Sequence, residues 1–455
     1  MSDEWKGRNV LVLGLGDTGL SALRWLSRRG ARLRAADSRE APASLGEVRA
    51  QFPAVRVALG AFDEALLAGV DTVVASPGIA LREPLLRAAL ARGVEVVGDV
   101  EIFAREVARR ATGARVLGIT GTNGKSTVTA LAGEMARAAG YDTVVAGNIG
   151  LPVLDALDQE KQPAQIYVIE LSSYQLETTA SLALDAAAML NLTQDHMDRY
   201  DSMADYARAK ERIFLHADRR IVNRDDAWSR SMADPGSFSF GLSEPRNNGE
   251  WGLDASRTRI RRGKDEIVEL GDMALTGLHN AANAMAAHAL GSALDLPPAA
   301  LAQALREFAG LPHRVELVAR AKGVSFYDDS KGTNVGASVA ALEGFRERVV
   351  LIAGGDGKGQ DFAPLAAAVK AHARAVVLLG RDAPVIAAAL ADANVPLANA
   401  TSMQEAVDAS YAFAHSGDAV LLSPACASFD MFRNYAHRGD VFAEAARSIA
   451  AREGP

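Results

Sequence analysis

Short runs of hydrophobic residues alternate with longer amphipathic segments along most of the chain. The runs at 10–13, 116–119 and 349–353 are rich in Val, Leu and Ile, and each leads into a glycine-containing turn. The segments at 18–29 and 126–139 have the apolar spacing of helices. Because continuous apolar strands alternating with helices are typical of parallel sheets covered on both faces, the pattern predicts an α/β fold.

The same pattern indicates where the chain divides. Further strands are expected at 32–36, 70–75, 166–169, 186–190, 375–379 and 419–422, and further helices at 101–112, 202–214 and 280–293. Alternating polar and apolar residues at 258–270 predict hairpins. A charged helix ends near residue 110, and residues 311–314 have the character of a linker. We therefore expect three domains, at 1–110, 111–311 and 312–455.

Composition narrows the class of protein. The 455 residues carry a net charge of −7 and contain no basic run, so we expect no nucleic-acid partner. The single cysteine, Cys426, excludes an internal disulfide and fits a reducing compartment. The N-terminus has no apolar signal-like region and no apolar run is long enough to span a bilayer. We expect a soluble cytoplasmic protein.

The strongest chemical motif is the sequence TGTNGKS at residues 120–126, between a strand and a helix. Its glycines let backbone N–H groups approach phosphate oxygens, Lys125 supplies a cation, and Ser126 offers a hydroxyl to Mg²⁺. A strict phosphate-binding motif of this kind would have glycine at the position of Ile119. The intact end of the motif still predicts an ATP site rather than an ordinary strand-to-helix turn.

A second glycine-rich turn, GLGDTG at 14–19, follows the first strand, and Asp37 stands at the end of the next strand. This spacing matches a dinucleotide-binding motif and supports an NAD- or FAD-dependent oxidoreductase as the main rival interpretation. The same turn can hold another nucleotide phosphate, or merely pack a helix on a sheet.

Two acidic positions follow strands of the central region. Glu170 ends the run at 166–169, where a carboxylate suits Mg²⁺, although it can equally be a helix-capping residue. Asp195 and His196 follow the strand ending at 190 and can be metal ligands, catalytic groups or part of a polar loop.

Lys210 is unusual because it lies within an apolar helical stripe. That stripe consists of Met203, Tyr206, Ala207, Ile213 and Phe214 on a helix that Ser202 can cap. The lysine either extends out to solvent or is buried. Burial would lower its pKa and leave a neutral amine, which can capture CO₂ as a carbamate, an additional carboxylate ligand for a metal.

Three loops of the last domain follow strands, at 327–334, 354–358 and 423–428. Open α/β sheets bind ligands at this edge, and the loops offer side chains suited to a small anion: Lys331, Thr333, Lys358 and Ser428. Cys426 has no base near it in sequence, so we interpret it as a packing residue.

Taken together, these motifs resemble the Mur ligases, which build the peptide stem of bacterial peptidoglycan. The resemblance runs from about residue 8 to the C-terminus and rests on motifs in a fixed order: 120–126, 170–175, 191–200, 206–210, 279–280, 313–314 and 329–334. It implies a Rossmann-like N-terminal domain, a P-loop ATPase-like central domain and a Rossmann-like C-terminal domain. It also implies addition of D-glutamate to UDP-N-acetylmuramoyl-L-alanine through an acyl phosphate, with release of ADP and phosphate.

The resemblance assigns roles residue by residue. It implies UDP-substrate contacts from Asp17, Thr18, Ser38, Arg39, Gly78, Asn148, Ser172 and Gln175. It implies ATP contacts from Gly121, Thr122, Asn123, Gly124, Lys125, Ser126, Thr127, Asn280, Asn283, Arg314 and Asp329. Two Mg²⁺ ions would be held by Ser126, Glu170, His196 and carbamylated Lys210, with Lys125, Glu170, His196 and Lys210 as the catalytic set. D-glutamate would contact Lys331, Thr333, Lys358, Ser428 and Tyr435.

Several alternatives stay open at this stage. A sibling ligase for another amino acid, or a folylpolyglutamate synthetase, shares the central motifs, whereas a dehydrogenase or a P-loop switch protein shares only one glycine-rich turn. Either His196 or Asp195 can deprotonate the incoming amine. We expect a monomer that acts on small molecules in the bacterial cytoplasm, in cell-wall precursor synthesis.

Overall fold

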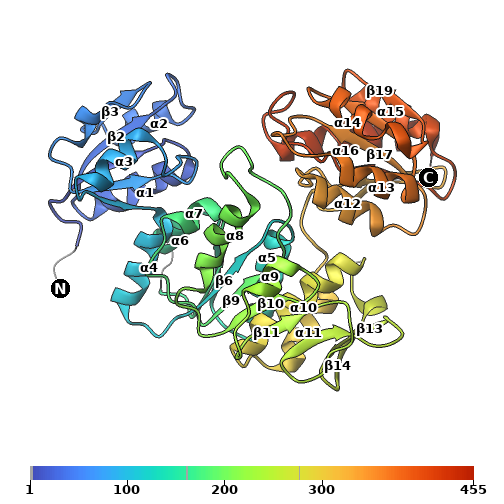
Figure 1. The fold of residues 1–455 in the computed structure, drawn as a ribbon, viewed down its shortest axis with the longest axis horizontal. Helices are drawn as coiled ribbons and strands as arrows, with labels where there is room; N and C mark the ends of the chain where they lie inside the picture. Colours follow the sequence, from blue (N-terminus) through green and yellow to red (C-terminus); the bar gives the residue numbers. More distant parts are fainter. Residues whose placement is uncertain (1–3, 160–161, 276, 455) are drawn as a thin grey trace.

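The structure, a computed structural model, describes residues 4–159, 162–275 and 277–454. The outermost residues of the first and last predicted domains, 1–3 and 455, lie outside this range. The chain forms three lobes, each built on its own sheet (Figure 1). The blue N-terminal lobe and the orange-to-red C-terminal lobe both lie above the central lobe in this view. The three-domain α/β architecture expected from the hydrophobic pattern is confirmed.

The N-terminal sheet is entirely parallel, in the order β3-β2-β1-β4-β5. Its strands are β1 Asn9–Leu13, β2 Arg32–Asp37, β3 Arg56–Leu59, β4 Thr72–Ala75 and β5 Glu95–Val97. Its helices are α1 Asp17–Arg28, α2 Leu45–Gln51 and α3 Pro84–Ala91, and α4 Asp99–Arg110 leads into the central lobe. The order reverses beside β1, so the loops after β1 and β4 meet at the ligand-binding edge of the sheet.

The central sheet has the order β14-β13-β12-β11-β10-β9-β6-β8-β7 and is parallel from β7 to β12. Its strands are β6 Arg115–Thr120, β7 Thr143–Gly147, β8 Ile166–Glu170, β9 Ala186–Met189, β10 Arg220–Asn223, β11 Phe238–Phe240, β12 Glu250–Leu253, β13 Arg259–Arg262 and β14 Asp265–Glu269. Its helices are α5 Lys125–Ala138, α6 Val153–Gln159, α7 Ser173–Glu177, α8 Met203–Glu211, α9 Ala227–Ser231, α10 Leu278–Ala293 and α11 Pro298–Glu307. Strand β13 pairs antiparallel with both β12 and β14. The hairpin of β13 and β14 is the kind of element that the alternation at 258–270 predicts.

The C-terminal sheet has the order β15-β16-β20-β17-β18-β19, and its edge strand β15 alone pairs antiparallel among the described strands of this sheet. Its strands are β15 Glu316–Ala321, β16 Val324–Asp328, β17 Val349–Gly354, β18 Ala373–Leu379, β19 Leu397–Asn399 and β20 Ala419–Leu422. Its helices are α12 Val335–Glu343, α13 Ala363–His372, α14 Ala383–Ala389, α15 Met403–Phe413 and α16 Tyr435–Glu453. The borders predicted at residues 110 and 311 fall between the sheets and remain predictions.

The N-terminal and central sheets share one hydrophobic core. Trp25 and Leu23 of α1, Phe103 of α4 and Tyr167 of β8 belong to the same buried cluster. Helix α6 packs against both α1 and α4. The guanidinium of Arg24 binds the carboxylate of Asp155 on α6, with its Nε 3.1 Å from Oδ1. The two lobes are therefore joined by packed side chains as well as by the chain itself.

The helix around Lys210 begins as predicted, because the Ser202 hydroxyl accepts a hydrogen bond from the Asp205 amide at 3.2 Å. It ends earlier than expected, at Glu211, and continues as a 3₁₀ turn over 212–214. Several short strands were not anticipated, among them β3, β7 and β19. All three lie at sheet edges, and β3 and β19 lack the continuous apolar run of a central strand, so they leave a weak sequence signal.

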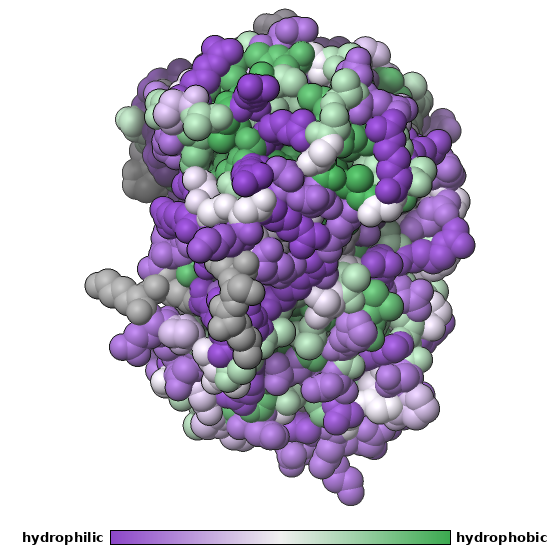
Figure 2. Space-filling model, turned by 90° about the vertical axis from the view of Figure 1, so that its left-hand side faces the viewer, coloured by the Kyte–Doolittle hydropathy of each residue, from purple (hydrophilic) through white to green (hydrophobic). Residues whose placement is uncertain are grey.

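No helix among the described residues is long and apolar enough to cross a membrane. On the side shown in Figure 2, hydrophilic residues predominate across the middle of the molecule, and hydrophobic residues gather in its upper part among hydrophilic ones.

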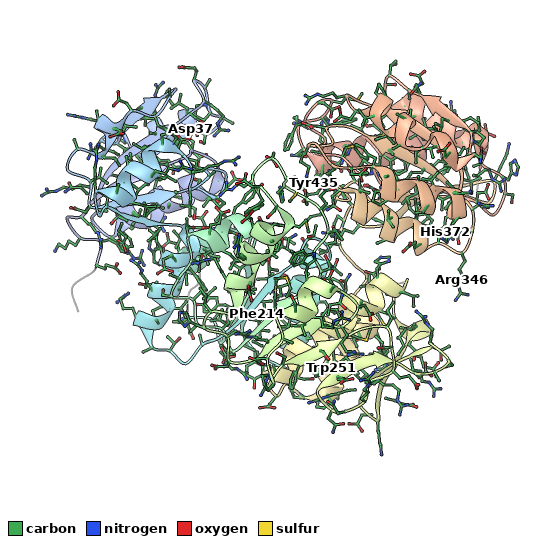
Figure 3. The ribbon with its side chains drawn as sticks, in the orientation of Figure 1. Asp37, Phe214, Trp251, Arg346, His372 and Tyr435 are labelled. Carbon is green, nitrogen blue, oxygen red and sulfur yellow. The ribbon has the colours of Figure 1, made fainter. Side chains whose placement is uncertain are left out.

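A buried histidine makes the stability of the central lobe depend on pH. The indole N–H of Trp251, a residue low in the central lobe (Figure 3), donates to Nδ1 of His288 at 3.0 Å. Burial lowers the pKa of His288 from 6.5 to about 4. The unfolded chain therefore binds a proton that the folded chain excludes between pH 6.5 and 4, so stability falls as pH falls through this window.

Because of His288, we expect the free energy of unfolding of the central lobe to fall by roughly 3 kcal/mol as the pH is lowered from 7.5 to 4. Urea unfolding of wild type and His288→Leu across this range measures the difference, with the exposed His216→Gln as the matched variant. A His288→Leu protein with the same pH dependence as wild type would contradict the assignment.

Candidate active site

The phosphate-binding turn joins β6 to α5 in a conformation that depends on its glycines. Gly124 has φ +81°, and a Cβ there would lie 2.4 Å from Oδ1 of Asn283 on α10. Asn191, which follows β9, braces the loop. The Thr122 amide donates to the backbone carbonyl of Asn191 at 2.9 Å, and the Asn123 amide donates to the side-chain oxygen of Asn191 at 2.8 Å. Ile119, the departure from the usual motif, is fully buried in the core. The turn therefore keeps a rigid phosphate-binding shape without the glycine at 119.

Two lysines converge on this loop. Nζ of Lys125 donates to the carbonyl of Thr122 at 2.7 Å. Nζ of Lys210 donates to the carbonyl of Gly121 at 2.8 Å and approaches the Thr120 hydroxyl at 3.3 Å. Lys210 is only 2% exposed, so burial rather than extension to solvent is the outcome for this residue. Burial, reinforced by the charge of Lys125, holds the pKa of Lys210 well below its ordinary value.

Glu170 ends β8 beside these lysines. It is 1% exposed, and its Oε1 accepts from Nδ2 of Asn148 at 2.8 Å. Its Oε2 is buried and has no hydrogen-bond partner among the described residues. A buried carboxylate oxygen left without a donor costs free energy, and a bound cation removes that cost.

The loop after β9 carries Asp195 and His196. His196 has φ +59°, and its ring lies 4.9 Å from the ring of Tyr174. Burial lowers the pKa of His196 to about 4 against the opposing charge of Asp195, so the imidazole is neutral at pH 7 and able to ligate a metal. Asp195 is engaged in this structure, since its Oδ1 accepts from Nζ of Lys358 at 3.0 Å.

A cavity of about 520 Å³ lies between the N-terminal and central lobes. Seven of the eight residues predicted to bind the UDP substrate line it: Asp17, Thr18, Ser38, Arg39, Gly78, Asn148 and Gln175. The eighth, Ser172, does not line the cavity and instead caps α7, where its hydroxyl accepts from the Gln175 amide at 3.2 Å. Ser172 therefore has a structural role that accounts for its position.

Asp37 does not offer the free carboxylate that a dinucleotide ribose requires. Its Oδ2 accepts from the Leu15 amide at 2.7 Å, and both oxygens accept from the Arg39 guanidinium at 2.7–2.8 Å. The Arg39 hydrogen bond is the largest influence holding the pKa of Asp37 down at about 2. The acid is thus committed to shaping the glycine-rich turn and orienting Arg39.

A second cavity, of about 300 Å³, lies at the seam of the central and C-terminal lobes. Its lining includes predicted ATP contacts from both sides of the seam: Asn123, Gly124, Thr127, Asn280, Asn283, Arg314 and Asp329. Gly121, Thr122, Lys125 and Ser126 are not part of the lining and lie along the loop and the first turn of α5. Apolar side chains complete the cavity and suit a planar base: Leu190, Phe240, Leu242 and Leu278.

Direct contacts hold the C-terminal lobe against the phosphate-binding turn. The side-chain amides of Asn334, at the start of α12, and Asn123 exchange hydrogen bonds of 3.0 and 3.3 Å. A Cβ on Gly336 would lie 2.9 Å from the Thr193 hydroxyl, so this close approach requires glycine. With the Lys358–Asp195 ion pair, these contacts bring the last two lobes together around the phosphate-binding turn.

The residues predicted to bind D-glutamate follow adjacent strands of the C-terminal sheet. Strands β16, β20 and β17 are neighbours, so the loops carrying Lys331, Ser428 and Lys358 emerge at one edge. Nζ of Lys331 lies 5.3 Å from the ring centre of Tyr435, on the inner side of the C-terminal lobe (Figure 3). Burial lowers the pKa of Lys331 to about 8. Thr333 lies in the loop after Lys331.

Cys426 is fully buried, and burial raises the pKa of its thiol to about 12, which confirms a packing role. Sequence reasoning missed Asn334 and Arg199, although both lie inside motifs that were recognised. It also missed Leu190, Phe240 and Leu242, because apolar residues at strand ends carry no signal that distinguishes a cavity wall from the core.

Three models of protein domains match successive parts of the chain. A Mur ligase MurD-like N-terminal domain matches residues 8–98, a Mur ligase middle domain 119–291, and a Mur ligase glutamate ligase domain 313–426. The matched ranges follow the three sheets in order.

Whole proteins are also similar. The UDP-N-acetylmuramoylalanine--D-glutamate ligase of Methylobacillus flagellatus is 57% identical, over 98% of both chains. The enzyme of the same name from Thiobacillus denitrificans is 55% identical, over 98% of this chain and 97% of that one. Among solved structures, MurF from Acinetobacter baumannii matches with a TM-score of 0.61 at 16% identity, over 98% of this chain and 92% of that one. UDP-N-acetylmuramate-alanine ligase MurC from Thermotoga maritima matches with a TM-score of 0.59 at 17% identity, over 98% of both chains. At this identity the two structures show a shared fold.

Proposed function

The chain belongs to the Mur ligase family, and on that premise we propose that it joins D-glutamate to UDP-N-acetylmuramoyl-L-alanine at the expense of ATP. The observation that carries the proposal is the pair of cavities at the two seams between lobes: the second is lined by the phosphate-binding turn, and Asn148 in the lining of the first donates to Glu170. The reaction serves peptidoglycan precursor synthesis. It requires only residues of one chain, which fits a monomer working in the cytoplasm where ATP is available.

The cavity between the first two lobes suits the UDP substrate. The glycine-rich turn after β1 and Gly78 after β4 offer backbone close to a pyrophosphate, while Ser38 and Arg39 stand where the uridine would lie. Asn148 lines this cavity and also donates to Glu170, so it links the nucleotide-sugar site to the phosphoryl-transfer site. The engagement of Asp37 argues against an NAD-dependent oxidoreductase.

Phosphoryl transfer depends on positioning and charge neutralisation. Lys125 would leave the Thr122 carbonyl and bind the β- and γ-phosphates of ATP, whose base would occupy the cavity at the second seam. The substrate carboxylate would then attack the γ-phosphorus. The bond from this phosphorus to the β,γ-bridging oxygen would break, and ADP would leave with the electron pair of that bond. The resulting acyl phosphate survives only if water is excluded, which the contacts of Asn334 and Lys358 across the seam favour.

The residues fit two Mg²⁺ ions. Glu170 has a buried oxygen with no hydrogen-bond partner among the described residues, His196 is neutral at pH 7, and Ser126 lies in the first turn of α5. Burial lowers the pKa of Lys210 and so favours its neutral amine, which would react with CO₂ to form a carbamate, another anionic ligand beside Glu170. Bound there, Mg²⁺ would neutralise the charge of the phosphates and of the attacking carboxylate.

The amino acid would bind at the edge of the C-terminal sheet. Lys331, Thr333, Lys358, Ser428 and Tyr435 provide cations, hydroxyls and a ring around a dicarboxylate. The D-glutamate amine would then attack the acyl carbon, pass through a tetrahedral intermediate and expel phosphate. Lys358 would exchange Asp195 for a substrate carboxylate, which frees Asp195 when all three substrates are present.

We expect phosphate release from ATP to require both UDP-N-acetylmuramoyl-L-alanine and D-glutamate, because the acyl phosphate needs the first substrate and productive turnover needs the second. The measurement is phosphate release with each common amino acid in turn at fixed nucleotide sugar. Turnover with L-lysine, diaminopimelate or a folate substrate would favour a sibling ligase, and oxidation of NADH would sink the ligase proposal.

A further inference from the structure

An arginine that follows the candidate metal ligand His196 reaches across to the N-terminal lobe. Nη1 of Arg199 donates to the carbonyl of Pro77 at 3.0 Å, and Nη2 approaches the carbonyl of Ile79 at 3.4 Å. These two residues flank Gly78, which lines the cavity between the first two lobes. One planar guanidinium therefore fixes the backbone on both sides of the residue assigned to the pyrophosphate.

The same side chain is held firmly from the central lobe. Its Nη2 pairs with Oε2 of Glu177, at the end of α7, and the other Glu177 oxygen accepts from the Tyr200 hydroxyl at 2.7 Å. The Arg199 side chain is 8% exposed and that of Glu177 is 15% exposed. Replacing a buried ion pair by apolar residues commonly costs a protein little stability, so this pair calls for another explanation.

Arg199 is also coupled to His196. The amides of Arg199 and Tyr200 donate to the His196 carbonyl at 2.9 and 3.2 Å, which closes a turn around the histidine. The Tyr174 ring contacts both ends of this turn, since the Arg199 guanidinium carbon lies 4.1 Å from its centre and the His196 ring 4.9 Å. The loop at 77–79 and His196 are therefore linked by side chains in direct contact.

A second contact runs beside the first. Nη2 of Arg82, in the N-terminal lobe, donates to the carbonyl of Asp198 at 2.7 Å. The loop at 195–200 is thus attached to the N-terminal lobe at two of its residues, and both attachments use the stretch that follows β4.

We infer that Arg199 is a positioning residue that couples binding of the UDP substrate to assembly of the metal site at His196. The inference rests on the proposed function. When the pyrophosphate orders the backbone at Gly78, Arg199 holds the turn of His196 in place, so nucleotide-sugar binding and binding of Mg²⁺ with ATP strengthen each other. Such coupling is reciprocal, because it is one free energy shared by two sites.

The experiment is a calorimetric cycle on the full-length protein. UDP-N-acetylmuramoyl-L-alanine is titrated first in EDTA and then in saturating Mg²⁺ with a non-hydrolysable ATP analogue, for wild type, Arg199→Met, Arg199→Lys and Arg208→Met. Arg208 is the matched control, because it is an exposed arginine paired with Asp205 on α8. We expect the wild-type and control affinities for the nucleotide sugar to rise about tenfold or more with the analogue. In Arg199→Met the ratio should fall to about one, and in Arg199→Lys to an intermediate value.

The affinity of Arg199→Met for the analogue alone should stay within about twofold of the wild-type affinity. Its melting temperature should stay within a few degrees of the wild-type value. Retained coupling in Arg199→Met overturns the inference, as does absence of coupling in wild type. If Arg199→Met loses affinity for both the nucleotide sugar and the ATP analogue and also has a lowered melting temperature, the inference is overturned and Arg199 has a purely structural role. If wild type fails to bind the nucleotide sugar in either buffer, the proposed function fails and the inference fails with it.

Discussion

Replacement of Lys210 by alanine is expected to lower kcat by roughly 10²–10³-fold, equivalent to about 3–4 kcal/mol of barrier. The amine is buried beside the phosphate-binding turn, where its hydrogen-bond acceptors are neutral oxygens and its pKa is held low. The lowered pKa favours the uncharged amine, which adds little to phosphoryl transfer, whereas a carbamate adds a negative ligand beside Glu170. Steady-state phosphate release measures the effect.

Chemical rescue separates the carbamate from a packing role. In Lys210→Ala the vacated space can admit formate, acetate or propionate, so these anions should restore part of the activity. In Lys210→Met the stem still fills the space, so the same anions should restore none, although packing and thermal stability are kept better. Wild type should lose activity in buffers stripped of CO₂ and regain it with bicarbonate. Full activity of the alanine variant, or indifference of wild type to bicarbonate, would exclude the carbamate.

Glu170→Gln should also abolish most activity, by roughly 10²-fold or more, without destabilising the protein. The buried Oε2 has no hydrogen-bond partner among the described residues, so this oxygen is open to a cation. Removing the carboxylate charge relieves a desolvation cost while leaving an oxygen to accept from Asn148. We therefore expect a melting temperature equal to or above that of wild type.

Activity of Glu170→Gln should recover in part at high Mg²⁺, because a weaker site can still be filled by mass action. Glu170→Asp is the matched variant that keeps the charge and shortens its reach. A glutamine variant with wild-type kcat and an unchanged Mg²⁺ requirement would remove Glu170 from the metal site, and a large drop in melting temperature would assign it to stability instead.

Much of the fold and the core of the site could be predicted from the sequence. Lys210 was identifiable because a charged residue interrupts a helical stripe, and the stripe is buried except for Met203, which is partly buried. The phosphate-binding turn was identifiable because backbone approach to phosphate demands glycine at fixed spacing. These are local signals, set by residues within one turn of each other.

What could not be predicted depends on contacts between distant segments. Arg199 lies inside a recognised motif, but its partners are distant in sequence and appear only once the loop after β4 is placed beside the loop after β9. Ser172 is predicted from resemblance to contact the substrate, and the structure adds that its hydroxyl caps α7, as the spacing of a serine three residues before a glutamine allows. Asn334 likewise gains its meaning from a partner more than two hundred positions away.

The hydrophobic cluster that the first two sheets share limits how this chain can be recombined. A chimera that took only the N-terminal sheet from another ligase would separate α1 from the α6 helix it packs against. It would also leave Arg24 without its partner Asp155. The exchangeable segment therefore runs from the N-terminus at least through α6, past the phosphate-binding turn. The C-terminal sheet has two cores of its own, so it is the natural module for transplanting amino-acid specificity.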